Sequence, residues 1–135
     1  MIRKLPKRKT DFLEIDNSGI IALSARAKEI YEEDLDNVEF LPIETDSGLF
    51  YAVNILTPLD CLDVEKSVFT ATETNRITSY KYLDFHPSKL KHTYIFRIPQ
   101  FIYTTFVTYQ FQAKYTKYGL CGLEFDMRSN LVWNN

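Results

Sequence analysis

The sequence predicts an α+β fold in which a mostly antiparallel sheet is packed by two helices, at about Ser24–Asp34 and Thr108–Tyr118. Apolar and polar residues alternate through most of the chain, which is the spacing of half-buried strands. The two helical stretches instead repeat apolar residues every three or four positions. With 45% apolar residues in 135 positions, the chain can close a hydrophobic core without further cross-links.

The chain is expected to begin with a basic arm, residues 1–10, and to continue as a single α+β domain, residues 11–135. The arm contains five Lys or Arg residues. Polar and apolar residues alternate over Asp11–Leu23 around the turn Asp16–Gly19, where Asn and Gly tolerate a positive φ. A hairpin or two short strands are therefore predicted here.

The first helix is predicted to start after Ser24, whose hydroxyl can accept a hydrogen bond from an unpaired N–H of the first turn. Its apolar residues fall on one face, which is the face expected to pack on the sheet. These residues are Ala27, Ile30, Tyr31 and Leu35.

Two strands are predicted next, Val38–Ile43 and Leu49–Leu56, joined by the turn Thr45–Gly48. The turn residues hydrogen-bond their own backbone or accept unusual φ angles, which makes this the clearest hairpin in the sequence. Pro58 cannot donate to a strand ladder and is expected to end the second strand. The acidic stretch Leu59–Ser67 is then predicted to be a connection.

The following region alternates well enough for another strand pair, Val68–Thr72 and Arg76–Phe85, with a turn at Thr74–Asn75. A short turn or helix is expected at Pro87–Lys91, and a strand at Thr93–Ile98. Strands therefore outnumber helices.

The C-terminal part is predicted to contain a strand, the second helix and a last short strand. Thr and aromatic residues favour extended structure over Ile102–Val107. Thr108 can cap the helix, and Gly119 stands where helices often end in a left-handed turn. The last strand is predicted at Leu120–Phe125. The apolar face of the helix consists of Phe111, Tyr115 and Tyr118.

The net charge of -2 conceals an uneven distribution. Between Glu29 and Glu65 the chain has eleven acidic residues and no Lys or Arg. Such an acidic block speeds encounter with a basic protein and repels nucleic acid, although an ordinary solvated face has the same composition. If a partner binds there, the expected contacts are Glu32, Glu33, Asp36, Asp60, Asp63 and Glu65.

No catalytic residue, cofactor site or metal site is predicted. His86 and His92 lack the spacing of a zinc site and are expected in turns or at the surface. The carboxylates of Asp60, Asp63 and Glu65 could hold a cation or act as an acid/base pair, so a small hydrolase is one alternative. Against it, the longer, glycine-centred series of a calcium loop is missing, and the four glycines build neither a phosphate loop nor a nucleophile elbow.

Cys61 and Cys121 are expected to be reduced thiols in an apolar setting, because neither belongs to a CxxC pair or a metal cluster. The longest apolar runs are too short to cross a bilayer, so no membrane contact is expected. Reduced cysteines and the missing membrane segment together predict a cytoplasmic protein.

A nucleic-acid-binding module is the main alternative to a protein-binding function. Nine aromatic residues fall between Tyr94 and Tyr118, with Arg97, Lys114 and Lys117 among them. Together with the basic arm they could form a stacking platform for single strands. Core packing also explains the aromatic residues, and the acidic block disfavours nucleic acid.

Several segments in a fixed order suggest a family. They are Ile20–Ser24 with the helix Ala25–Glu33, Glu39–Ile43, Tyr51–Leu56, Leu59–Ser67, Tyr94–Pro99 and Gly119–Phe125. In this order the chain resembles the bacterial polymorphic-toxin immunity proteins of family eleven, over about residues 19–125.

The resemblance implies an immunity protein that binds and neutralises a cognate bacterial toxin by occluding its active surface. It carries over no catalytic motif, so the protein is not expected to be an enzyme. The acidic block would face a toxin with a basic surface. Because members of that family commonly have more N-terminal sequence, the chain is expected to be a short or truncated member.

Overall fold

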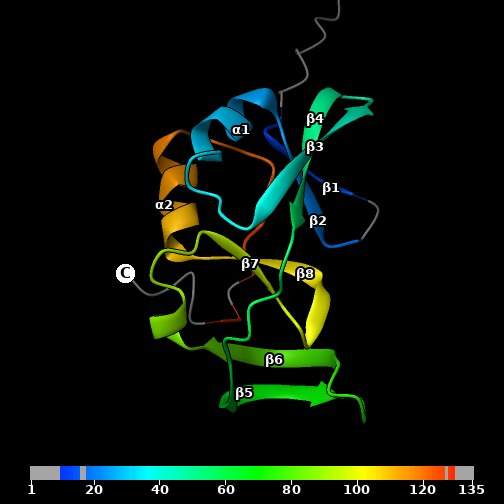
Figure 1. The fold of residues 1–135 in the computed structure, drawn as a ribbon, viewed down its shortest axis with the longest axis vertical. Coiled ribbons are helices and arrows are strands. Elements are labelled where there is room, and N and C mark those ends of the chain that lie inside the picture. The colour runs from blue at the N-terminus through cyan, green and yellow to red at the C-terminus, as the bar shows by residue number, and fades with distance from the viewer. Residues whose placement is uncertain (1–9, 16–17, 127, 130–135) are drawn as a thin grey trace, which may run out of the picture.

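The computed structural model describes residues 10–15, 18–126 and 128–129 of the chain (Figure 1). Its strands pair antiparallel in three separate sheets, which confirms the α+β class with mostly antiparallel strands and two helices. The predicted basic arm, apart from Thr10, lies outside the described residues, as do the turn residues Asp16 and Asn17. The elements are β1 (Phe12–Ile15), β2 (Ile20–Leu23), α1 (Ala25–Tyr31), β3 (Val38–Thr45), β4 (Gly48–Ile55), β5 (Leu62–Ala71), β6 (Ile77–Phe85), the 3₁₀ helix η1 (Pro87–Lys89), β7 (Ile95–Ile98), β8 (Phe101–Val107) and α2 (Tyr109–Lys117).

The largest sheet has the strand order β1-β2-β4-β3 and is built from the two predicted N-terminal hairpins. The register pairs Thr45 with Gly48 at the β3–β4 turn, as the turn composition predicts. Because side chains alternate across a strand, one face of this sheet presents Leu23 of β2 and Val53 of β4 to α1. The two hairpins thus provide a layer on which helices can pack.

Helix α1 begins where the sequence predicts, because Ser24 Oγ accepts a hydrogen bond from Ala27 N at 3.1 Å. It ends at Tyr31, three residues before the predicted end at Asp34. The carbonyl oxygen of Tyr31 accepts hydrogen bonds from both Asp34 N and Leu35 N, at 2.8 and 3.1 Å. This tightens the last turn and closes the helix before the acidic residues that follow.

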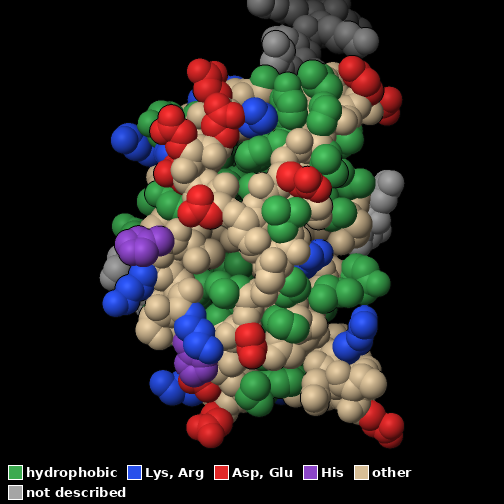
Figure 2. All heavy atoms as spheres, in the orientation of Figure 1, with side chains coloured by type: hydrophobic (Ala, Val, Ile, Leu, Met, Phe, Trp, Pro, Cys, Tyr) green, Lys and Arg blue, Asp and Glu red, His purple; other side chains and the backbone are tan. Residues whose placement is uncertain are grey.

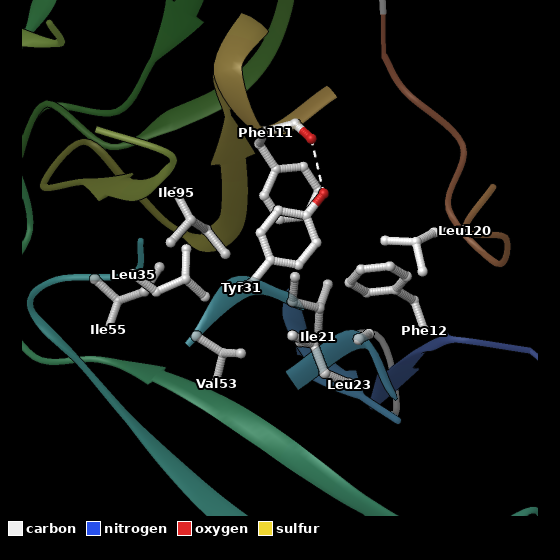
Figure 3. Packing of buried hydrophobic residues seen from close by; sticks show 11 residues of the cluster. Phe12, Ile21, Leu23, Tyr31, Leu35, Val53, Ile55, Ile95, Phe111 and Leu120 are labelled. Atoms are coloured by element: carbon white, nitrogen blue, oxygen red, sulfur yellow. Dashed lines mark hydrogen bonds between the residues drawn. The ribbon is translucent and has the colours of Figure 1, made fainter. Parts of the chain in front are cut away.

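The first hydrophobic cluster lies between this sheet and the two helices (Figure 3). At its centre the ring of Tyr31 stacks on that of Phe111, with 4.3 Å between centroids and 9° between planes. The Tyr31 hydroxyl donates a hydrogen bond to the Phe111 carbonyl oxygen at 2.7 Å. A single buried side chain of α1 therefore joins α1 to α2 through both ring contact and hydrogen bonding.

The second hydrophobic cluster is built by the hairpins β5–β6 and β7–β8. The rings of Phe85, Phe96 and Phe106 contact one another with centroid separations of 5.1 to 5.5 Å. Most of the aromatic residues in this part of the chain therefore pack in a core.

Strand β5 corrects the prediction that Leu59–Ser67 is a connection. The strand already starts at Leu62, and Asp63 pairs with Asp84 of β6. An irregularity follows, since the ladder resumes only at Val68. Within this irregularity Ser67 Oγ accepts a hydrogen bond from Asp84 N at 2.8 Å, so a side chain takes the place of a backbone partner. The alternation of apolar and polar residues that marks a strand is therefore lost here.

The segment after α2 is irregular, so the predicted strand at Leu120–Phe125 is wrong. Its backbone groups bond to side chains elsewhere in the chain instead of a neighbouring strand: Cys121 N donates to Asp11 Oδ2 at 3.1 Å and Leu123 N to Tyr115 Oη at 3.1 Å.

Thr108 occupies the predicted N-cap position of α2. Its hydroxyl, however, donates to the Thr93 carbonyl oxygen at 2.6 Å and caps no helical N–H.

Candidate partner-binding site

A pocket of about 250 Å³ opens between the β1–β2 hairpin, β8 and the C-terminal segment, residues 123–126 and 128–129. Its inner end is apolar, because Ile21 and Phe106 line it and are almost fully buried. Its lining also includes Tyr103, which is 65% exposed, and the exposed residues Glu14 and Glu124. The pocket lining therefore combines buried apolar residues with exposed acidic ones.

Two features of the sequence position this pocket. Phe12 and Glu14 project from the same face of β1, so the strand passes from the hydrophobic cluster directly to the pocket rim. At the β1–β2 turn, Gly19 has φ +76°, and a Cβ there would lie 1.7 Å from the Tyr103 carbonyl oxygen. Glycine thus lets the turn touch β8, and the Thr105 hydroxyl donates to the Gly19 carbonyl oxygen.

Tyr80, Asp126 and Arg128 form a polar cluster along one side of the pocket. The Arg128 guanidinium carbon lies 4.2 Å from the Tyr80 ring centroid. The guanidinium also donates two hydrogen bonds to the Asp126 carboxylate, from Nε to Oδ1 at 3.0 Å and from Nη2 to Oδ2 at 2.7 Å. Its third nitrogen, Nη1, donates to the Tyr80 carbonyl oxygen at 2.9 Å. Hydrogen bonding to Arg128 lowers the pKa of Asp126 to about 2, and burial raises the pKa of Tyr80 to about 12.

This cluster holds the C-terminal segment on β6. Leu83 N donates to the Arg128 carbonyl oxygen at 2.8 Å, and Leu83 also forms a parallel bridge with Ser129. Since Asp126 neutralises Arg128, the pocket keeps the charge of Glu14 and Glu124. Among the described residues neither of these two carboxylates has a hydrogen-bond or ion-pair partner.

No pattern in the sequence predicts this pocket. Tyr80 and Asp126 are 46 positions apart, and their hydrogen bond, Tyr80 Oη to Asp126 Oδ2 at 2.8 Å, has no local pattern that could reveal it. The nearest signal is the pairing of Asp126 with Arg128 two positions later, which also occurs in ordinary surface turns.

The six acidic residues predicted as partner contacts fall into two groups. One group follows the end of α1 and the other lies at β5. Figure 1 places α1 at the top of the molecule and β5 at the bottom. Figure 2 shows acidic side chains gathered around α1. We call Glu32, Glu33 and Asp36 the helix group and Asp60, Asp63 and Glu65 the strand group. The six residues come from one acidic block of the sequence, yet α1 and β5 lie at opposite ends of the molecule in Figure 1.

Most carboxylates of both groups are exposed. In the helix group Glu32 pairs with Lys28 Nζ at 2.8 Å, while Glu33 and Asp36 have no ion-pair partner among the described residues. In the strand group Asp63 is half-buried and accepts from Lys66 N at 3.2 Å. The unpaired carboxylates are available to a partner at little desolvation cost.

The geometry gives little support to the hydrolase alternative. Asp63 Oδ2 lies 3.8 Å from His86 Nδ1, but no group of three metal-ligating side chains occurs among the described residues. Cys61, next to Asp60, is fully buried, and burial raises the pKa of its thiol to about 12. A thiol with that pKa stays protonated near neutral pH and makes a poor nucleophile.

The aromatic residues between Tyr94 and Tyr118 divide between core and surface. Phe96, Phe106 and Phe111 are buried in the two clusters, whereas Tyr103, Tyr109 and Tyr118 are at least 40% exposed. Tyr103 lies on β8 and Tyr109 on α2, and Tyr118 is the C-cap residue that follows α2. Core packing therefore accounts for much of the pattern that suggested a nucleic-acid platform.

The face of the four-stranded sheet opposite α1 is also apolar. By register, Leu13 of β1, Ala22 of β2, Ala52 of β4 and Leu41 of β3 share it, and Leu41 is 45% exposed. Figure 2 shows hydrophobic side chains over the β3–β4 hairpin. The edge strand β3 contains Pro42 within the ladder, a residue that discourages pairing with a further strand.

Comparison with known proteins gives one family match. Residues 2–129 match the immunity protein family (Imm11). The chain belongs to this family. No curated protein matches it.

Membership in the immunity protein family implies a cognate toxin as partner and a protein that works by binding. The match includes the pocket and both acidic groups. Within the described residues no helix is long and apolar enough to cross a membrane.

Proposed function

We propose that this immunity protein binds a cognate toxin with a basic surface and occludes the toxin's active surface. The observation that carries the proposal is the set of exposed carboxylates without ion-pair partners among the described residues, Glu33, Asp36, Asp60 and Glu65. The fold makes no visible use of these charges, and surface charges of one sign chiefly raise the rate of encounter with a partner of opposite charge.

The proposed mode of action is binding without catalysis, in the cytoplasm, by a single domain over residues 11–135. The helix group and the strand group each contribute part of the toxin interface. Because they lie at different ends of the molecule in Figure 1, each group is expected to act as a separate contact region.

The test compares two triple charge reversals, Glu32→Lys/Glu33→Lys/Asp36→Lys and Asp60→Lys/Asp63→Lys/Glu65→Lys. The ligand is the cognate toxin domain, which is to be sought in the gene adjacent to that of this protein. Reversing a group that faces the toxin should lower the association rate constant by about tenfold or more at low salt. The loss should shrink near 0.1 M salt, where the Debye length is about 10 Å.

A matched control is Glu73→Lys, an exposed acid near the β5–β6 turn that belongs to neither group. Circular dichroism verifies that each variant is folded. Unchanged association by both folded triple variants would remove the acidic groups from the interface. If the toxin domain does not bind the wild-type protein and a single-stranded oligonucleotide does, the nucleic-acid alternative replaces the proposal.

A further inference from the structure

We infer that the pocket between the β1–β2 hairpin, β8 and the C-terminal segment receives an arginine side chain of the protein partner. This inference rests on the proposed function, because it names a contact by which the toxin is held. It concerns a different part of the surface from the helix group and the strand group.

The size of the pocket fits one side chain. Cofactors and drug-sized ligands occupy pockets of about 300 to 1,000 Å³, whereas this one measures about 250 Å³. Its floor contains Ile21 and Phe106, both almost fully buried, which suits the aliphatic stem of a long side chain.

The charge of the pocket selects a cation. The one described cation in its lining, Arg128, gives all three guanidinium nitrogens to Asp126 and to the Tyr80 carbonyl oxygen. Glu14 and Glu124 remain as two carboxylates without partners among the described residues. An incoming guanidinium could pair with either of them without breaking an existing bond.

An aromatic ring at the rim favours arginine over other cations. Tyr103 of β8 lines the pocket and is 65% exposed. A planar guanidinium can stack on such a ring and bind a carboxylate at the same time, which an ammonium group does less well. The pocket already contains one such contact, that of Arg128 on the ring of Tyr80.

The first test uses small probes and does not depend on the toxin. N-acetyl-arginine amide is titrated into the isotope-labelled protein and followed by amide NMR, with N-acetyl-citrulline amide as a neutral control of the same shape. Saturable shifts at residues 104–107 and 123–126 are expected with the arginine probe and should disappear in the variant Glu14→Gln/Glu124→Gln. Absence of saturable shifts, or equal shifts with citrulline, would overturn the inference.

The second test measures affinity for the toxin domain. The Glu14→Gln/Glu124→Gln variant should bind roughly tenfold more weakly, and the control Glu73→Gln should bind like the wild type. If the toxin binds the wild type and the double variant equally, the pocket inference fails and the proposed function stands. If the toxin binds neither protein, the proposed function fails, and the probe titration still decides whether the pocket accepts arginine.

Discussion

The contact between Tyr31 and Phe111 predicts a stability change that reverses sign with pH. Tyr31→Phe keeps the ring that stacks on Phe111 and removes the hydroxyl that donates to its carbonyl oxygen at 2.7 Å. A net hydrogen bond of this kind contributes about 1 kcal/mol. At pH 7 the variant should therefore unfold with about 1 kcal/mol less free energy, and its melting temperature should fall by about 3–5 °C.

In alkali the order should invert. Burial raises the pKa of Tyr31, so its phenol ionises more readily in the unfolded chain than in the folded protein. The stability that this neutral phenol contributes is fully present below the unfolded pKa of about 10 and is lost as pH rises above it. At pH 11 the wild type has lost about 1.4 kcal/mol through this group, which exceeds the hydrogen bond, so Tyr31→Phe becomes the more stable protein.

The assay is urea unfolding at pH 7, 10 and 11, followed by circular dichroism, with Tyr109→Phe as the matched control. Tyr109 is 40% exposed on the same helix as Phe111, so removing its hydroxyl should leave the free energy of unfolding nearly unchanged. A Tyr31→Phe variant as stable as the wild type at pH 7, or a difference that does not change between pH 7 and pH 11, would refute the reasoning.

Three further experiments test other parts of the fold. Gly19→Ala should lower the free energy of unfolding in urea by about 3 kcal/mol or more, because a Cβ there would lie 1.7 Å from a backbone oxygen of β8. Gly48→Ala should lower it by only about 1 kcal/mol, because the space around Gly48 is open. Asp126→Asn should lower the free energy of unfolding at pH 7 by no more than about 1 kcal/mol, since its side chain is 46% exposed. Its depressed pKa of about 2 means that this difference is present above about pH 4 and disappears as pH falls towards 2, which a pH series of unfolding curves would show or contradict. In thiol labelling of the native protein near pH 8, the buried Cys61 should stay unmodified while the partly exposed Cys121 reacts. Both thiols should react in urea. Rapid labelling of Cys61 in the native protein would contradict its burial.

The parts of the fold that could be predicted from the sequence are those decided by neighbouring residues. The β3–β4 hairpin follows from the turn Thr45–Gly48, and the start of α1 from the hydroxyl of Ser24. In both cases the chemistry that fixes the backbone acts within a few positions. The left-handed end after α2 is of the same kind, since Gly119 has φ +61°.

The parts that could not be predicted depend on residues far apart. Strand β5 was hidden because Ser67 interrupts the ladder with its side chain. The segment Leu120–Phe125 has the alternation of a strand, but its backbone bonds to Asp11 and Tyr115 instead. Alternation reports which side chains are buried and does not identify the backbone partner.

The candidate site shows the same limit. The acidic composition was visible in sequence, whereas the separation of α1 from β5, at opposite ends of the molecule in Figure 1, depends on the fold of the whole chain. The pocket combines β1, β8 and residues 123–126 and 128–129, so its aromatic and acidic lining has no counterpart in any local stretch. Whether the six predicted acidic residues contact the toxin remains a prediction.

The arrangement of the two hydrophobic clusters also has a consequence for the order of folding on the ribosome. The second cluster draws all its buried members from Cys61 to Phe106, whereas the first needs Phe12 near one end and Leu120 near the other. As the chain emerges, the second cluster has every component before the last partners of Tyr31 have been synthesised. The inner part of the chain can therefore fold first, and docking of α2 then completes the outer part.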